Sequence, residues 1–326
     1  IYNLDKMGYA SDNTRINLEL KKIKNIKERY QKITLDLQNY NEVVYAINTI
    51  KPDLVIHLAA ESHVDRSINS PKEFIYSNII GTFNLLEALR IYLEKINEMK
   101  KQNFLFYHIS TDEVFGSLSK QGRFDEDTAY KPNSPYSASK ASSDHLVKSW
   151  GETYGISVCI SNCSNNYGPW QFPEKLIPIV ITNALDGKII PIYGDGLNIR
   201  DWLYVEDHVD AILLIASSSK REKCFCIGGN CEKTNLEIVE DICKILDKLK
   251  SKDSSYKDQI RFVADRPGHD RRYSIDATKI KRELLWEPKT NFKKGLENTI
   301  KWYLSNSEWI YKIKKKSGYG GERLGV

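Results

Sequence analysis

Short apolar runs alternate with amphipathic stretches through the first half of the chain. The runs that suit buried strands are Ile1 to Leu4, Lys32 to Leu35, Asp53 to Leu58, Phe104 to Ile109 and Ser157 to Ile160. Helical spacing is found between them at residues 42–50, 71–98 and about 137–154. The long stretch carries Ile75, Ile79, Phe83, Leu86 and Leu89 on one stripe. This alternation predicts an α/β fold with a doubly wound parallel sheet.

The pattern changes after residue 168, where prolines, glycines and aromatic residues become frequent. We therefore expect two domains. The first covers residues 1–168 with returns at about 202–230 and 286–301. The second is a smaller, interleaved α/β domain for substrate binding within residues 169–326, mainly 169–201, 231–285 and the C-terminal part.

Composition and charge exclude several classes of protein. The 326 residues include 48 basic and 43 acidic side chains, a formal net charge of +5, and the basic residues are scattered. Nucleic-acid binding would need a concentrated basic surface, and no apolar run reaches the ~18 residues of a membrane span. The six cysteines lack the paired spacing of a zinc site and are too few for a disulfide framework. We expect reduced cysteines in a cytoplasmic protein without a bound metal.

Tyr136 and Lys140 are four residues apart in a predicted helix, so their side chains share one face. A free tyrosine titrates near pH ~10. A neighbouring ammonium group and an oxidised nicotinamide ring would lower that pKa and make Tyr136 a base. The alternative is a chance surface pair, which the preceding Pro135 and the small residues between the two side chains make less favoured.

Thr111, Asp112 and Glu113 follow the predicted strand that ends near Ile109. Ligands of open α/β sheets bind at this end of the strands. Adjacent carboxylates point to opposite faces of a regular strand, so they serve one site only if the strand ends there. One interpretation is a pair with one carboxyl protonated and one ionised. The other is a pair that caps the next helix.

Further polar groups also follow predicted strands. Asp5 and Asp36 have the spacing expected for contacts to the ribose and adenine of a dinucleotide. The small residues of the segment 58–62 would let a cofactor approach the backbone. Lys175, Arg200 and Arg266 could bind a diphosphate or form surface salt bridges. His63 and His269 have no partners at metal-ligand spacing, so structural or substrate-contact roles are favoured.

Seven longer strings resemble the dTDP-glucose 4,6-dehydratases of the extended short-chain dehydrogenase/reductase superfamily, over nearly the whole chain. These strings are His57 to Ser67, Ser110 to Gly116, Tyr136 to Lys140, Asn162 to Pro169, Phe172 to Pro178, Arg200 to Asp207 and Asp265 to Asp270. The resemblance implies a Rossmann-type sheet and the conversion of dTDP-glucose to dTDP-4-keto-6-deoxyglucose and water with bound NAD. Open alternatives are a UDP-glucose epimerase, a GDP-mannose dehydratase and an inactive binding protein.

The resemblance also implies roles for the motif residues. Tyr136, helped by Lys140, would deprotonate the 4-hydroxyl of the glucose as hydride passes from C4 to NAD+. Glu113 would then remove the C5 proton while a protonated Asp112 donates to the departing 6-hydroxyl. Thr111 would hydrogen-bond the O4 region.

Binding residues follow from the resemblance by position. The implied NAD contacts, besides Tyr136 and Lys140, are Asp5, Lys6, Met7, Gly8, Asp36, Leu37, Leu58, Ala59, Ala60, Glu61, Ser62, Ser77 and Asn166. The implied nucleotide-sugar contacts are Ser62, Thr111, Asn165, Lys175, Leu176, Pro191, Ile192, Tyr193, Arg200, Asn235, Asp265, Arg266, His269, Asp270 and Tyr273. Gly8 and Ser77 differ from the family's usual threonines, and Gln38 replaces an acid.

The family pattern begins with a strand, a glycine-rich phosphate turn and a helix ahead of the position of Ile1. We expect the printed chain to lack this first strand and helix, to bind NAD poorly and to have reduced stability. The resemblance further implies a homodimer formed through a helical bundle that includes the helix of Tyr136.

Overall fold

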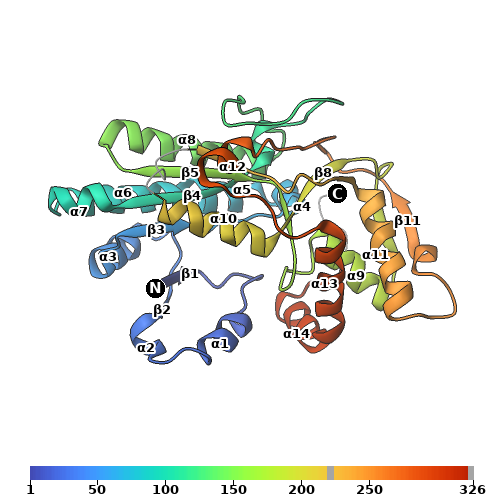
Figure 1. Ribbon diagram of the computed structural model, residues 1–326. Coiled ribbons are helices and arrows are strands. Elements are labelled where there is room, and N and C mark those ends of the chain that lie inside the picture. Colours follow the sequence, from blue (N-terminus) through green and yellow to red (C-terminus); the bar gives the residue numbers. More distant parts are fainter. Residues whose placement is uncertain (219–223, 322–326) are drawn as a thin grey trace.

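A parallel sheet of four strands forms the centre of the computed structural model, which describes residues 1–218 and 224–321 (Figure 1). The order is β3-β4-β5-β9. The strands are β3 (Leu54–His57), β4 (Leu105–Thr111), β5 (Val158–Cys163) and β9 (Cys224–Ile227). All three pairings are parallel, with Phe106 of β4 opposite Val55 of β3 and Val158 of β5. The predicted α/β class is confirmed.

A separate parallel pair lies at the N-terminal end of the chain. It consists of β1 (Tyr2–Asp5) and β2 (Gln31–Thr34). Among the described residues, neither strand is hydrogen-bonded to the four-stranded sheet. The carboxyl end of β1 nevertheless reaches the loop after β3, because Lys6 Nζ forms an ion pair with Glu61 Oε1 at 2.6 Å.

Helices cover both faces of the four-stranded sheet because side chains alternate along its strands. Phe104 and Phe106 pack with α3 (Tyr40–Ile50), α6 (Gly81–Leu93) and α8 (Pro135–Tyr154). Leu105 and Tyr107 pack on the other side with α10 (Val205–Ser217) and α12 (Thr278–Leu284). The other short helices are α1 (Thr14–Leu20) and α2 (Ile26–Arg29), which connect β1 to β2, and α4 (Val64–Asn69) and α7 (Glu98–Asn103).

The long helical stretch predicted at 71–98 contains a change of helix type. It consists of α5 (Pro71–Phe74), the π-helix η1 (Ile75–Ile80) and α6, which ends at Leu93. A π-helix has more residues per turn than an α-helix, so a stripe drawn at α-helical spacing does not stay on one face. Leu86 and Leu89 are fully buried, whereas Ile75 and Phe83 are 41% and 39% exposed. The prediction of one stripe at α-helical spacing through this stretch was therefore wrong, because the π-helix interrupts that spacing.

A second lobe lies at one end of the sheet (Figure 1). Its strands are β6 (Asn165–Tyr167), β8 (Ile199–Tyr204) and β10 (Glu232–Thr234) in the order β10-β8-β6, and the pair β7 (Ile190–Tyr193) and β11 (Ile260–Val263). Its helices are α9 (Leu176–Leu185), α11 (Asn235–Leu249), η3 (Tyr256–Gln259), α13 (Phe292–Ser305) and α14 (Ser307–Ser317). The predicted domain boundaries stay a prediction.

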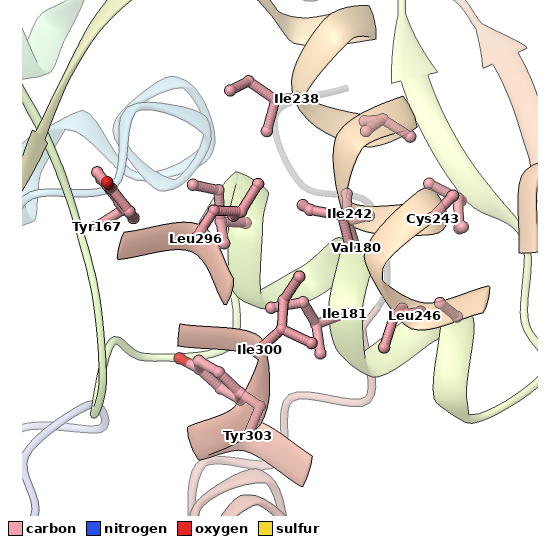
Figure 2. Close-up of a cluster of buried hydrophobic side chains, with 14 of the residues drawn as sticks. Tyr167, Val180, Ile181, Ile238, Ile242, Cys243, Leu246, Leu296, Ile300 and Tyr303 are labelled. Carbon is pink, nitrogen blue, oxygen red and sulfur yellow. The ribbon is translucent and has the colours of Figure 1, made fainter. Parts of the chain in front are cut away.

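The second lobe has its own hydrophobic core, in which α9, α11 and α13 meet. Figure 2 shows Val180 and Ile181 of α9 facing Ile242 of α11 and Ile300 of α13. The amphipathic pattern of α11 begins at a capping box, since Thr234 Oγ1 accepts from the backbone N–H of Glu237 and the Glu237 carboxylate accepts from the N–H of Thr234. This core anchors the elements that bring basic residues toward the end of the central sheet.

Two absences apply to the described part of the chain. No helix there is long and apolar enough to cross a membrane. No group of three or more His, Cys, Asp or Glu side chains there could hold a metal ion.

We predict that Ile300→Ala destabilises the second lobe, because Ile300 is fully buried at the meeting point of three helices. The expected loss in the free energy of unfolding is about 2–5 kcal/mol. Urea denaturation of the variant would measure it. Ile189→Ala is the matched control, since Ile189 is largely exposed, and should change stability by less than about 0.5 kcal/mol. Equal effects for both variants would contradict this packing.

Candidate active site

The strand β4 ends where the two adjacent carboxylates begin. Thr111 is its last residue, and Asp112 starts the short 3-10 helix η2 (Asp112–Phe115). Thr111 Oγ1 caps this turn by accepting a hydrogen bond from the backbone N–H of Glu113 at 3.3 Å. In a continuing strand the side chains of Asp112 and Glu113 would point to opposite faces. Because the strand ends here and the backbone turns, both carboxyls can serve one site.

Asp112 lies in a pocket that disfavours its charged form. The residue is 1% exposed, and its Oδ2 atom has no hydrogen-bond partner among the described residues. Burial raises the pKa of the Asp112 carboxyl well above its usual range, and the nearby charges of Glu113 and Asp201 add to the shift. Both effects favour the neutral form of Asp112, whose unpartnered oxygen is placed to donate a proton.

Glu113 has a different electrostatic environment. Burial raises its pKa, but the positive charges of Arg266, Arg200 and Lys175 act in the opposite direction. A carboxylate opposite three cations ionises more readily than its buried neighbour. The two adjacent carboxyls are thus arranged as one acid and one base.

Tyr136 is positioned by the start of α8. Ser134 and Ser137 form a capping box, and Pro135 occupies the first helical position. The Tyr136 ring is buried, and its backbone N–H donates to Ser67 Oγ at 3.2 Å. Burial and the charge of Glu113 raise the pKa of Tyr136 well above its usual range, although a hydrogen bond with Thr111 lowers it. The chain alone therefore gives a shift opposite to the one expected for a tyrosine base.

Lys140 is 4% exposed, one turn along α8 from Tyr136. Its ammonium group donates to the carbonyl of Ile109 at 2.9 Å and lies 3.3 Å from His108 Nε2. The alternative of a chance surface pair is excluded for Tyr136 and Lys140, because both side chains are buried at the carboxyl end of β4.

The three cations that face Glu113 come from the second lobe. Arg200 of β8 donates to the carbonyl of Asp270 at 3.0 Å, and its guanidinium lies 4.2 Å from the centre of the Tyr273 ring. Arg266 forms an ion pair with Asp65 at 2.7 Å, and Lys175 donates to the carbonyl of Ser62 at 2.6 Å. These residues are buried or half-buried rather than paired on the surface.

Comparisons with known proteins agree with this arrangement. A family model described as GDP-mannose 4,6 dehydratase matches residues 2–299. A dTDP-glucose 4,6-dehydratase from Salmonella typhimurium is 50% identical over 325 residues, which cover 96% of this chain and 88% of that protein. The protein belongs to the dTDP-glucose 4,6-dehydratase family.

Solved structures of this dehydratase family share the fold. The dTDP-glucose 4,6-dehydratase of Bacillus anthracis in complex with NAD is 41% identical, with a TM-score of 0.81, and the match covers 96% of this chain and 91% of that one. DesIV of Streptomyces venezuelae, with NAD and TYD bound, is 38% identical, with a TM-score of 0.84 and coverage of 96% and 90%.

Most of the substrate-contact residues that the dehydratase resemblance implied lie around the same cations. Asp270 accepts hydrogen bonds from Tyr273 OH at 2.5 Å and from Asn133 at 2.6 Å. His269 Nδ1 lies 2.6 Å from Asp265 Oδ1. The backbone N–H of Asn235 donates to Asn198, two residues before Arg200.

The remaining implied substrate contacts differ in whether their side chains are free to reach a ligand. Ile192 is buried in the core of the second lobe and Leu176 packs against it, so only backbone atoms of Ile192 could touch a ligand. Tyr193, from the same strand β7, donates to Asp65 Oδ2 at 3.1 Å. Asn165 Oδ1 is buried without a hydrogen-bond partner among the described residues, as expected for an atom that awaits a ligand. Pro191 lies on the same strand, between Ile190 and Ile192.

The residues implied to bind the dinucleotide fit an adenosine ribose. Asp5 Oδ1 accepts from the backbone N–H of Met7 at 2.6 Å and from Ser11 Oγ at 3.0 Å. Its Oδ2 atom makes no hydrogen bond within residues 1–218 and 224–321, so it can accept from a ribose hydroxyl. Asp36 Oδ1 accepts from the backbone N–H of Gln38 at 2.9 Å.

The end of β3 provides the next part of this surface. Leu58 and Ala59 are exposed there although both are apolar. The carbonyl of Leu37 is held by Asn84 at 2.8 Å, and Asn166 Oδ1 lies 2.9 Å from His208 Nδ1. Gly8 and Ser77 are half-buried and accessible from solvent. An exposed apolar edge beside buried Tyr136 and Lys140 suits a planar ring system, so the present residues fit a dinucleotide.

Sequence reasoning missed several buried polar residues that support this site. Asp65 pairs with Arg266, Glu174 pairs with Arg66 at 2.7 Å, and Asp144 lies behind Lys140. A signal existed for Asp144, which stands four residues after Lys140 on the same helix face. The partners of Asp65 and Glu174 are more than 100 positions away along the chain, so local spacing gave no signal for them.

We predict that Asp112→Asn stabilises the protein at neutral pH. An aspartate whose folded pKa is raised loses stability as the pH rises from its ordinary value of 3.8 through the raised folded value. The variant removes that loss, so its Tm should exceed that of the original chain at pH 7, by at least about 2 °C, with little difference near pH 4. Thermal unfolding at both pH values measures this.

Asp195→Asn is the control for this prediction. Asp195 is exposed, and a hydrogen bond from Arg271 lowers its pKa, so this variant should gain no stability at neutral pH. The same Tm difference for Asp112→Asn at pH 4 and pH 7 would show that Asp112 is not held neutral.

Proposed function

We propose that this chain performs the reaction of the family to which it belongs, as an NAD-dependent dTDP-glucose 4,6-dehydratase, a lyase. It converts dTDP-glucose to dTDP-4-keto-6-deoxyglucose and water. The observation that carries this proposal is the split carboxyl pair at the end of β4, with a buried Asp112 whose Oδ2 is unpartnered and a Glu113 facing three cations.

In this proposal Tyr136 accepts the proton of the sugar 4-hydroxyl. NAD+, when bound, would take hydride from C4 and return it at C6. Lys140 places a positive charge one turn from Tyr136, which favours the phenolate that burial alone disfavours. Thr111, which interacts with Tyr136 and caps η2, would hydrogen-bond the O4 region and polarise the resulting ketone.

Glu113 and Asp112 then carry out the elimination. The 4-ketone acidifies the C5 proton, and Glu113 removes it. Asp112 donates its proton to the 6-hydroxyl, which leaves as water. Glu113 returns its proton to C5 at the end. This step requires two carboxyls of opposite protonation state, and the different environments of Asp112 and Glu113 support this assignment.

The proposed binding residues form two groups, one for the substrate and one for NAD. Lys175, Arg200 and Arg266 would hold the diphosphate of the substrate, with His269 and Tyr273 beside it. Asp5 and Asp36 would hold the adenosine side of NAD, and the segment 58–62 would lie along its middle.

A 4-epimerase is the second candidate within this fold. It would use Tyr136 and Lys140 but would not need an acid and a base for loss of water, so the arrangement of Asp112 and Glu113 favours the dehydratase. The choice of dTDP over GDP is supported by the 50% identity to dTDP-glucose dehydratases.

We further propose that the enzyme is a homodimer that pairs the α8 side of the sheet. Ile75, Tyr76, Ile80 and Phe83 are exposed large apolar residues that follow one another along η1 and α6. Helices α6 and α8 pack together, and the Phe83 ring contacts Trp150 of α8 edge-on. Exposed apolar surface of this kind is typical of an interface between protein chains. The enzyme's six free cysteines suit a reducing cytoplasm.

We predict that Glu113→Gln lowers kcat for product formation by at least about 10²-fold, because a glutamine cannot take the C5 proton. Exchange of that proton with D2O, followed by NMR of the sugar, should disappear with it. Glu206→Gln is the matched control, since Glu206 is an exposed carboxylate on α10. Release of dTDP-galactose instead of a 4-keto-6-deoxy sugar would contradict the proposed function.

We predict that Ile80→Asp combined with Phe83→Asp converts a dimer into monomers, because buried carboxylates at an apolar interface oppose association. Light scattering after size-exclusion chromatography measures the mass. Leu213→Asp is the control, because Leu213 is also an exposed apolar residue but lies on α10, across the sheet. A wild-type monomer, or equal effects of both variants, would refute the proposed interface.

A further inference from the structure

A buried carboxylate, Asp144, lies directly behind the lysine of the proposed reaction. It is fully buried on α8, four residues after Lys140. Its Oδ2 atom accepts hydrogen bonds from Ser110 Oγ at 2.8 Å, Tyr130 OH at 3.0 Å and Asn162 Nδ2 at 3.3 Å. Three donors from β4, β5 and the loop before α8 therefore converge on one oxygen.

The other oxygen of Asp144 lies near the same histidine nitrogen that Lys140 contacts, and it has no hydrogen-bond partner among the described residues. His108 Nε2 lies 3.2 Å from Asp144 Oδ1 and 3.3 Å from Lys140 Nζ. Burial and the charge of Lys140 lower the pKa of His108 to about 4, so the ring is neutral at neutral pH. A neutral imidazole thus lies between an ammonium group and a carboxylate.

Asp144 is suited to remain ionised in this position. Burial alone would raise its pKa, but its contact with His108, the charge of Lys140 and the Ser110 hydroxyl together lower it. For Lys140 the directions are reversed: burial lowers the pKa of its ammonium group, and the negative charge of Asp144 raises it. A buried cation persists only with such a counter-charge.

We propose that Asp144 is a positioning residue that keeps Lys140 protonated in its place beside His108 and the Ile109 carbonyl, one turn of α8 from Tyr136. This inference rests on the proposed function, because the role of Lys140 does. Asp144 itself touches neither substrate nor cofactor in this account and acts only through Lys140.

Several other titratable groups face this pair. Lys140 is faced by His57 from β3, His108 from β4, Cys163 from β5 and Asp144 from α8. Asp144 is also faced by Tyr130 and by Cys224 from β9. Burial raises the pKa of Cys163 to about 12 and that of Cys224 to about 11, so neither thiol supplies the counter-charge at neutral pH. Asp144 is the fixed anion among the described groups around Lys140.

The test is the pH dependence of turnover by Asp144→Asn, which keeps the shape and removes the charge. Lys140 should then lose its proton at lower pH, so the alkaline limb of kcat should move down by at least about one unit. The KM for dTDP-glucose should stay within about twofold, because Asp144 does not touch the substrate. Tyr130→Phe is the matched control, since it removes one hydrogen bond to Asp144 but leaves the charge, and its alkaline limb should not move.

A limb that coincides with that of the original enzyme, or a loss of kcat that is equal at every pH, would overturn the proposal. A failure of the original chain to dehydrate dTDP-glucose would instead overturn the proposed function. If Asp144→Asn does not fold, the double variant Lys140→Met, Asp144→Asn decides the matter. If the double variant folds, the pairing of Asp144 with Lys140 is supported, because the uncompensated buried cation is no longer present. If the double variant does not fold although Lys140→Met alone does, the pairing is contradicted.

Discussion

Removal of ionisable groups from water at the carboxyl end of β4 is the constraint on which this structure depends. Asp112, Tyr136 and Lys140 are all buried there, and Glu113 is only partly accessible. Burial disfavours the charged form of each group, so each must be neutral or matched by a nearby opposite charge. Asp112 is left neutral, Glu113 is opposed by cations, and Lys140 is opposed by Asp144. The same desolvation that makes these groups costly to the fold sets the protonation states that the proposed elimination requires.

The parallel sheet and the second lobe contribute different charged groups to the site. The sheet supplies the acid, the base and the Tyr136 and Lys140 pair, all from β4, η2 and α8. The second lobe supplies Arg200, Arg266 and Lys175, and its separate core of α9, α11 and α13 holds them in place (Figure 2). Ion pairs such as Arg266 with Asp65 join the two parts, so the environment of Glu113 exists only when both are packed together.

Much of the sheet and the reacting residues could be predicted from the sequence, because both are local patterns. The apolar runs located β3, β4 and β5, and the motif at 111–113 located the end of β4. The single apolar stripe predicted within residues 71–98 was wrong because the π-helix η1 changes the number of residues per turn. No residue type in the sequence indicates that change. Asp65 and Glu174 were missed because their partners come from distant segments, whereas the i, i+4 spacing of Asp144 from Lys140 was a local signal that the prediction did not use. Burial raises the pKa of Tyr136 in the chain without cofactor, so the lowered pKa expected beside an oxidised nicotinamide ring stays a prediction.

The central claim is that Asp112 is protonated at neutral pH while the adjacent Glu113 is ionised. Infrared difference spectroscopy in the carboxylic acid region, comparing the original chain with Asp112→Asn and Glu113→Gln, tests this directly. The account predicts a protonated carboxyl band at pH 7 that is lost in Asp112→Asn and retained in Glu113→Gln. A spectrum without such a band, or one in which the band belongs to Glu113, would contradict it.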